Sequence, residues 1–359
     1  MRHLKLAGVL LLLCLAVACS PAERFVPSPY QLLAERFDPQ AAGHGLDAYT
    51  PTEASDHAMA YALVASAEAR WHALKGDAQA LERAERAAAW LVENRDSDGD
   101  GLVGWGLPFA WDAFGDGSTN PAGWPYTITT ALAIQGLLDV HDATRERELV
   151  DVALEATNAL LDHAFTRTPD EAWFHYSPSE HDAYAVYNVS AMMLGQLQRL
   201  AAFEPTLEEV ADLVAAHLLS ARLVDVSGRV HWMYSAPGSP SADRENDLVH
   251  AAYIVQGLAD YVRFGGRLTV DVAALYRSLR AFLMPGGTVS EMPHGDAPAR
   301  DWGVGAALFT AALLEQELGV HDLLSRDFYG VATSYDPPDE KFYPRQAAHV
   351  LLGLALTSP

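Results

Sequence analysis

Two kinds of helical segment alternate along the chain, and this alternation restricts its fold more than any other feature. Segments of the first kind are apolar around nearly their whole circumference and rich in Ala, Leu and Gly: 56–74, 126–140, 186–201, 248–264, 302–318 and 345–356. Segments of the second kind carry charge along one side: 78–94, 145–163, 207–223 and 270–283. A helix that is apolar on all sides is buried, whereas an amphipathic helix covers a core with one face. The pattern predicts an all-α ring of paired helices, with six inner helices and an outer layer.

Short extended pieces with aromatic or histidine residues connect each outer helix to the next inner helix. They span 101–105, 172–176, 229–234, 288–294 and 341–343. The unit of inner helix, outer helix and aromatic loop recurs every 45 to 70 residues or so, roughly the period of stacked helical hairpins. The segment 321–340 shows no clear period and predicts either a short helix or an irregular lid. The ring is predicted to occupy residues 55–359.

The first eighteen residues have the layout of a secretory signal peptide. Arg2 and Lys5 precede an apolar run over 6–17, which is too short to span a membrane comfortably. The string Leu-Ala-Val-Ala-Cys at 15–19 resembles a bacterial lipobox, in which the cysteine is acylated and becomes the first mature residue. The alternative is an ordinary A-x-A cleavage site. The resemblance implies a signal peptide over 1–18 and lipidation of Cys19.

Residues 19–54 are rich in Pro and short polar side chains, which predicts a tether with one short helix at 30–36. In a Gram-negative lipoprotein, Ser20 after the cysteine implies the outer membrane. The expected location is therefore the cell envelope, with the lipid anchor in the outer membrane and the protein facing the periplasm or the cell surface.

Charge and cysteine content exclude several functions. The chain has 24 basic and 47 acidic residues, a net charge of −23, which disfavours nucleic acid as a partner and favours neutral or short anionic ligands. Its two cysteines are Cys14 and Cys19, so the mature body has no thiol. Disulfides, cysteine zinc sites and thiol nucleophiles are thereby excluded.

Three local strings support a family resemblance: Gly-Trp-Pro-Tyr at 123–126, Tyr-Asn-Val-Ser at 187–190, and the stretch from Asp247 through His250 to Tyr253. With the helix pattern, they make residues 55–359 similar to the (α/α)6 toroid superfamily of glycoside hydrolases, polysaccharide lyases and the helical domain of glucuronyl C5-epimerases. The resemblance implies a carbohydrate-active enzyme that acts on an oligo- or polysaccharide without a required cofactor.

Other helical toroids fit less well. The chain has neither the aspartate-rich motif of squalene cyclases nor the zinc-binding cysteine of protein prenyltransferases. It also lacks a phosphate-binding loop, a dinucleotide fingerprint and an H-E-x-x-H string. A different alternative stays open, namely a non-catalytic lipid-anchored protein that binds carbohydrate or serves in assembly, with partners that the sequence does not name.

The loops that lead into the inner helices form the concave surface of such a toroid, so the residues there are the candidates for function. Asp247 and His250 lie three residues apart on one helix face, close enough to act together. We predict that the catalytic residues are Asp247, His250, Glu245 and Tyr187. In the alternative interpretation, Asp247 only caps the helix and His250 is an interior histidine.

A wider ring of aromatic and polar residues is predicted to bind substrate: Asp112, Tyr126, His175, Tyr176, Asn188, His231, Glu291, Asp301, Trp302 and Arg345. Aromatic rings stack on the apolar face of a sugar, and polar tips bond its hydroxyls. Arg345 is predicted to pair with a uronate carboxylate or with a neighbouring aspartate. His175 and His231 occupy equivalent places in successive repeats, which equally suits a structural role.

The reaction type stays open at this point. A glycosidase needs two carboxyl groups at a controlled separation. A lyase or epimerase needs a base such as His or Tyr, and a group that neutralises a uronate. The sequence offers members of both sets.

Asp96, Asp98 and Asp100 alternate with small residues in a string that matches the first half of a calcium loop. Leu107 stands at the twelfth position, where such loops carry a bidentate Glu. The string predicts either a structural calcium site or a solvated acidic turn.

Overall fold

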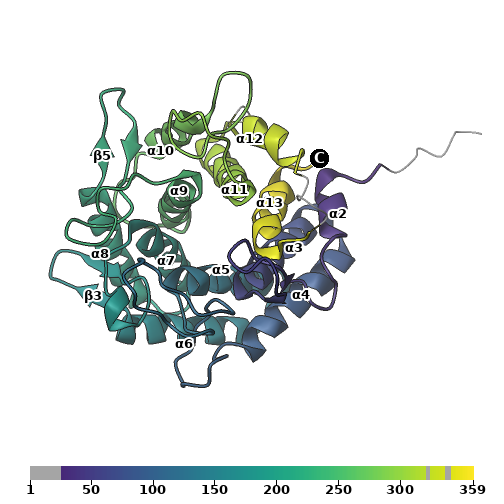
Figure 1. Cartoon of the computed structure of the whole chain (residues 1–359), viewed down its shortest axis with the longest axis horizontal. Helices are drawn as coiled ribbons and strands as arrows, with labels where there is room; N and C mark the ends of the chain where they lie inside the picture. The colour runs from purple at the N-terminus through teal and green to yellow at the C-terminus, as the bar shows by residue number, and fades with distance from the viewer. Residues whose placement is uncertain (1–25, 321–323, 336–340) are drawn as a thin grey trace, which may run out of the picture.

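The computed structural model describes residues 26–320, 324–335 and 341–359. Six helices form an inner ring: α3 (Ala58–Lys75), α5 (Thr127–Thr144), α7 (Tyr187–Leu200), α9 (Leu248–Arg263), α11 (Asp301–Leu318) and α13 (Pro344–Thr357). Each packs against the next, and α13 returns to pack against α3 (Figure 1). The predicted all-α toroid is confirmed.

An outer layer surrounds this ring: α4 (Ala78–Glu93), α6 (Arg147–His163), α8 (Leu207–Ser220), α10 (Val272–Leu279) and α12 (Leu324–Ala332). Each outer helix packs against the inner helix that precedes it in the chain (Figure 1). Helix α12 lies in the segment for which a short helix or a lid was expected, so the described part of that segment is a short helix. None of the described helices has both the length and the apolar character needed to cross a membrane.

The sixth outer position is taken by α2 (Pro29–Ala34), which packs against α13. Tyr30 is fully buried there, its hydroxyl donates to Glu68 Oε2 at 2.7 Å, and its ring stacks on Trp71. From Pro29 onward, the extension predicted as a tether is therefore packed into the fold.

Short strands join the helices, paired as β1 (His44–Gly45) with β2 (Ser55–Asp56), β3 (Phe165–Arg167) with β4 (Ala172–Phe174), and β5 (Leu223–Val224) with β6 (Val230–His231). All three pairs are antiparallel. The 3-10 turns η1 (Glu180–Asp182) and η2 (Arg280–Phe282) complete the connections. Strands β4 and β6 fall within two of the predicted extended pieces, each of which leads into an inner helix.

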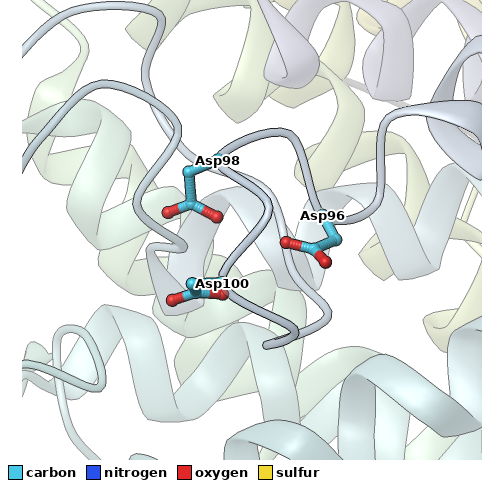
Figure 2. Close-up of side chains that lie close together, drawn as sticks. All are labelled: Asp96, Asp98 and Asp100. Atoms are coloured by element: carbon cyan, nitrogen blue, oxygen red, sulfur yellow. The ribbon is translucent and has the colours of Figure 1, made fainter.

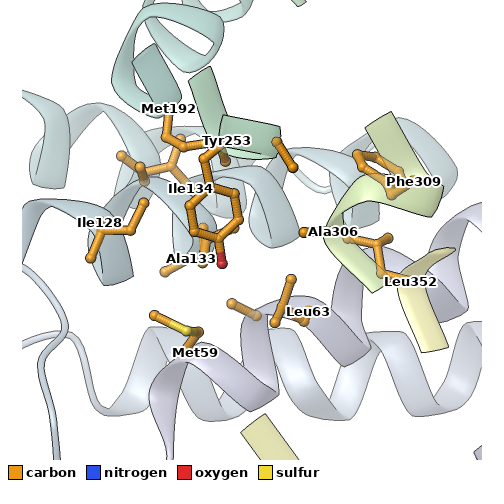
Figure 3. Packing of buried hydrophobic residues seen from close by; sticks show 14 of the residues in the cluster. Met59, Leu63, Ile128, Ala133, Ile134, Met192, Tyr253, Ala306, Phe309 and Leu352 are labelled. Atoms are coloured by element: carbon orange, nitrogen blue, oxygen red, sulfur yellow. The ribbon is translucent and has the colours of Figure 1, made fainter. Parts of the chain in front are cut away.

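All six inner helices contribute side chains to the core at the centre of the ring. Figure 3 shows them converging: Met59, Leu63, Ile128, Ala133, Ile134, Met192, Tyr253, Ala306, Phe309 and Leu352. Glycine permits the closest helix approach, because a β-carbon at Gly257 of α9 would overlap the carbonyl of Ala191 in α7. Centrally placed apolar side chains explain why these helices lack a polar face.

A buried charge cluster lies at the C-terminal ends of the inner helices. Asp139 of α5 is held by Arg70 of α3, with Nε 2.7 Å from Oδ2, and by Arg199 of α7, with Nη1 2.8 Å from Oδ1. Burial opposes the charge on Asp139, but the two guanidinium groups outweigh it and lower its pKa. These contacts link α3, α5 and α7 at the end of the ring opposite the helix N-termini.

Candidate active site

A cavity of about 230 Å³ lies at the N-terminal ends of the inner helices. Every inner helix supplies a residue from its first turns: Met59, Ile128, Thr129, Asn188, Val249, His250, Tyr253, Trp302 and Arg345. Loops and helix caps add Tyr49, Leu107, Trp111, Ala113, Tyr126, Tyr176, Tyr234, Arg244, Asp247 and Arg300. The wall is thus mainly aromatic and basic.

Asp247 and His250 form a hydrogen-bonded pair at the start of α9. Asp247 is the N-cap residue, and its Oδ1 accepts the backbone N–H of His250 at 3.2 Å and lies 2.5 Å from His250 Nδ1. An ionised carboxylate only accepts hydrogen bonds, so Nδ1 carries the proton and Nε2 of the neutral ring has a free electron pair. Asp247 therefore caps the helix and also orients the imidazole.

Arg300 holds the other oxygen of Asp247. Its Nη2 donates to Asp247 Oδ2 at 3.0 Å, while its Nε donates to Glu291 Oε1 at 2.6 Å. Burial favours the neutral form of Asp247, but the bonds from His250 and the charge of Arg300 outweigh it and lower the pKa. Asp247 is the one carboxylate among the described residues that line the cavity, and it is held by these two partners.

Tyr253 follows His250 by three residues on the same face of α9 and reaches a second imidazole. Its hydroxyl oxygen lies 2.5 Å from Nε2 of His349, whose Nδ1 lies 2.7 Å from the carbonyl oxygen of Arg345. That carbonyl requires a proton on Nδ1, so Nε2 accepts the hydroxyl proton. Burial lowers the pKa of His349 to about 4 and raises that of Tyr253. Near neutral pH both groups are therefore uncharged.

Arg345 is tied to the N-terminal part of the chain. Its Nη2 donates to Asp47 Oδ1 at 2.9 Å, and its Nε lies 2.8 Å from Oδ2. Both side chains are almost completely buried. The guanidinium faces Trp302 and Tyr49, with 5.0 and 5.3 Å from its carbon to the ring centroids. Of the two partners predicted for Arg345, the structure contains the aspartate.

Two polar groups of the wall have no partner among the described residues. Asn188 is 3% exposed, yet its Oδ1 accepts no hydrogen bond, and Nε1 of Trp302 donates none. Buried polar atoms are nearly always paired in native proteins. An amide and an indole left unpaired in a cavity can bond the hydroxyls of a ligand.

The structure brings together in this cavity part of the predicted set: Asp247, His250, Tyr126, Tyr176, Asn188, Trp302 and Arg345. The hydroxyl of Tyr126 donates to the carbonyl of Trp111 and accepts from Asn120, and burial raises its pKa to about 12. The positions of these residues agree with their predicted roles, which stay predictions.

Two predicted catalytic residues lie elsewhere. Glu245 binds Arg229, with 2.6 Å between Oε1 and Nη2, and lines a different, smaller pocket. It stands in an extended stretch bridged to Met233, where successive side chains point in opposite directions, so Arg244 faces the cavity and Glu245 faces away. Tyr187 is buried against His217 of the outer helix α8, with 5.5 Å between the ring centroids.

Several predicted binding residues also lie outside the cavity wall. Asp112 accepts backbone N–H bonds from its own loop at 114–117, and His175 bonds Thr166 in the β3–β4 hairpin. His231 lines the smaller pocket with Glu245. Glu291 accepts a hydrogen bond from the wall residue Arg300 but does not line the cavity itself. Asp301 is the first residue of α11 and does not line the cavity. These positions fit the structural alternative for His175 and His231.

The wall residues that were not predicted include Tyr49, Trp111, Tyr234, Arg244 and Arg300. Arg300 directly precedes α11, so the rule that selects residues at inner-helix entrances could have found it. Arg244 stands next to the predicted Glu245. The two side chains point in opposite directions, and the sequence does not show which of them faces the cavity. Tyr49 could not be found, because its segment reads as a polar tether.

The predicted calcium ligands cluster on a loop away from the cavity wall. Figure 2 shows Asp96, Asp98 and Asp100 close together, and one oxygen of each lies within 4.8 Å of the others. Burial and the charge of Asp100 raise the pKa of Asp98. Leu107, at the twelfth position, is in the cavity wall and adds no ligand. Structural calcium stays a prediction.

Several solved structures share this fold over nearly their whole length. A sugar epimerase from a ruminal bacterium superposes with a TM-score of 0.60 at 10% identity, covering 92% of this chain and 96% of the epimerase. Cellobiose 2-epimerase from Spirochaeta thermophila gives 0.58 at 13% identity, with 90% and 92% covered. An inactive variant of an α-1,6-mannanase from Salegentibacter sp., in complex with α-1,6-mannotriose, gives 0.62 at 12%, with 91% and 98% covered.

No family model and no curated protein matches the sequence. The identities to the solved structures are low, so the likeness concerns the path of the chain. The chain therefore has the (α/α)6 toroid fold, which it shares with these sugar epimerases and with the mannanase.

Proposed function

We propose that the cavity is the active site of a carbohydrate-active enzyme that moves a proton at a sugar carbon next to a carbonyl or carboxyl group, as an epimerase or a lyase does. The observation that carries this proposal is the pair of Asp247 and His250 in the cavity wall, in which His250 Nε2 has no hydrogen-bond partner among the described residues. Glycoside hydrolysis would require a second carboxyl group. Among the described wall residues, Asp247 is the one carboxylate.

Each member of the site has a role in this proposal. Nε2 of His250 takes the proton from carbon, and the negative charge of Asp247 stabilises the imidazolium that forms. Arg300 keeps Asp247 ionised and in place. The negative charge that develops on the substrate oxygen is stabilised by the hydrogen-bond donors and guanidinium groups of the wall.

The comparisons support a carbohydrate-processing enzyme at the level of the fold, and they do not separate epimerases from hydrolases such as the mannanase. Two of the similar structures are sugar epimerases by name, and both superpose over nine-tenths of this chain. At 10–13% identity they do not transfer residue roles. The assignment of His250 therefore depends on the geometry of this site.

Proton NMR in D2O tests the proposal, with the full chain in detergent and a panel of neutral and uronic oligosaccharides. We expect one C–H signal of a substrate to disappear, or an unsaturated uronate to form. His250→Ala should slow this exchange by about 10²- to 10⁴-fold, the usual contribution of a general base. His163→Ala is the matched control, because His163 is exposed on the outer helix α6 and lies outside the cavity wall, and it should leave the rate unchanged.

Other results would contradict the proposal. New anomeric signals from broken linkages would mean hydrolysis. Line broadening of a sugar without any product or exchange would instead favour a non-catalytic carbohydrate-binding or assembly protein, the second function that the sequence leaves open.

We also propose that Cys19 carries a lipid anchor in the cell envelope. Residues 1–25, including the predicted signal peptide and Cys19, lie outside the described residues. The lipobox-like string at 15–19 supports the proposal. Mass spectrometry of the mature N-terminal peptide should find a diacylated cysteine, and Cys19→Ala should move the protein from the membrane fraction to the soluble fraction. Cys14→Ala is the matched control and should change neither result.

A further inference from the structure

Three arginines gather in the wall of the cavity of an acidic protein. The chain has a net charge of −23, yet the cavity wall contains Arg244, Arg300 and Arg345 and one carboxylate among its described residues. Because acidic residues outnumber basic residues by about two to one, three arginines in one cavity wall are not expected from the composition alone. An arginine in this wall that no carboxylate neutralises would favour a ligand with negative charge.

Two of the three arginines already have carboxylate partners. Arg300 binds Asp247 and Glu291, and Arg345 binds Asp47. Arg244 has no carboxylate within 4.0 Å among residues 26–320, 324–335 and 341–359. Its charge is thus available to a ligand.

Arg244 is held in place without a counter-charge. Its guanidinium carbon lies 3.8 Å from the centroid of the Tyr234 ring, which is a stacking contact. Tyr234 is buried, and its ring meets the ring of His250 edge-on at 5.2 Å. The stack therefore places a planar cation beside the proposed base.

The backbone adds to the positive potential. All six inner helices present their N-termini to the cavity, and each N-terminus carries a partial positive charge. Asn188, which is 97% buried and whose Oδ1 accepts no hydrogen bond from the described residues, lines the same cavity.

We propose that the ligand is a sugar that carries a carboxylate, and that Arg244 binds this carboxylate. The planar fork of a guanidinium matches the two oxygens of a carboxylate. A cavity of about 230 Å³ is smaller than the roughly 300–1,000 Å³ typical of drug-sized ligands, which suits one acidic sugar ring or the end of a short chain. This inference names the substrate class of the proposed active site and so rests on that proposal.

Calorimetric titration of the full chain in detergent, with matched pairs of sugars, tests whether the ligand is an acidic sugar bound by Arg244. The probes are the methyl glycosides of glucuronic and galacturonic acid, their glucose and galactose counterparts, and glucose 6-phosphate. At least one uronoside should bind tenfold or more tightly than its neutral counterpart. Arg244→Gln should lower the affinity for that uronoside tenfold or more and leave the affinity for the neutral sugar unchanged. Arg244→Lys should lose less of the affinity for the uronoside than Arg244→Gln does.

Arg222→Gln is the matched control, because Arg222 is exposed and lies outside the cavity wall, and it should change neither affinity. The inference is overturned if the uronosides fail to bind, if they bind no better than the neutral sugars, or if Arg244→Gln weakens both equally. Tighter binding of the phosphate than of every uronoside would overturn the assignment to a carboxylate.

The two proposals fail in distinguishable ways. A uronoside preference that depends on Arg244, without any proton exchange in D2O, would contradict the enzymatic proposal alone. Proton exchange on neutral sugars that is unaffected by Arg244→Gln would contradict the substrate class alone.

Discussion

Two imidazoles, one in the cavity wall and one behind Tyr253, stand in opposite electrostatic settings. His250 is bonded to the ionised Asp247, whose charge would stabilise a proton on the ring. His349 is buried and bonded to a backbone carbonyl and to Tyr253, and the nearby charge of Arg345 disfavours a second proton. His250 is therefore suited to carrying a proton during a reaction, and His349 to fixing the hydroxyl of Tyr253.

The setting of His349 predicts how stability depends on pH. Its pKa falls from the usual 6.5 to about 4 on folding, so the unfolded chain binds more protons between these values. Stability is then lost as the pH falls from 6.5 towards 4, by up to about 3 kcal/mol. In His349→Gln, this part of the pH dependence of the free energy of unfolding should be absent. Urea unfolding at several pH values between 4 and 6.5 measures it.

The exposed residue His163 provides the control for this measurement. His163→Gln should leave the pH dependence as it is in the wild type. An unchanged slope in His349→Gln would show that a proton enters the buried ring without cost.

At the scale of elements, the inner helices are packed through their small residues. Gly257 of α9 lies directly against the backbone of Ala191 in α7, whereas Gly330 of the outer helix α12 has nothing within 4 Å of the position of a β-carbon. The same residue type therefore has a packing role in one helix and none in the other.

Alanine substitution separates these two glycines. Gly257→Ala should destabilise the protein by about 1–3 kcal/mol or more, because the methyl group forces α7 and α9 apart. Gly330→Ala should stabilise it by roughly 0.5–1 kcal/mol, since alanine is the better helix former. Thermal unfolding by calorimetry measures both. Equal effects of the two substitutions would contradict the close packing of α7 and α9.

The sequence predicts the helices well, because their composition reflects burial. Segments apolar on all sides, such as 302–318, match the inner helices to within a few residues, here α11 at Asp301–Leu318. Helix α12 is less distinct, since nine residues hold little periodic signal. Residues 26–54 read as a tether because Pro and polar residues dominate, and the packing of Tyr30 against Trp71 of α3 is a tertiary contact that no local pattern reports.

The site is predictable only in part, for a geometric reason. Residues on the first turn of an inner helix must face the cavity, so positions such as His250 and Asn188 could be found. Loop residues have no such constraint, and Arg244 and Glu245 point in opposite directions although they are neighbours. Asp47 contacts Arg345 across 298 positions of sequence, a pairing that spacing does not indicate.

At the scale of the whole molecule, the ring closes where α13 meets α3, and the N-terminal segment lies along this seam. Asp47 is fully buried there against Arg345 and lies 3.9 Å from His57, measured from Oδ2 to Nδ1. Backbone bonds add to the contact, since Leu46 N–H donates to the carbonyl of Phe342. The seam is therefore held by side-chain and backbone contacts together.

Removing one charge at the seam should have a large effect. Asp47→Ala leaves the Arg345 guanidinium buried without a counter-charge, which typically costs about 3–5 kcal/mol. Urea unfolding should show this loss, and Asp47→Ala with Arg345→Met should recover part of it. Asp151→Ala, which breaks an exposed pair with Arg147, is the control and should cost less than about 1 kcal/mol. A small effect of Asp47→Ala alone would contradict a closed seam.

The pairing of Asp47 with Arg345 also determines when the cavity comes into existence. A ribosome makes Asp47 long before Arg345, with 298 positions between them. Until α13 docks, the cavity lacks Arg345, and Tyr253 lacks the imidazole that accepts its proton. A chain that stops short of α13 can thus contain Asp247 and His250 without a finished site, and the cavity is complete only when the segment around Asp47 and α13 have met.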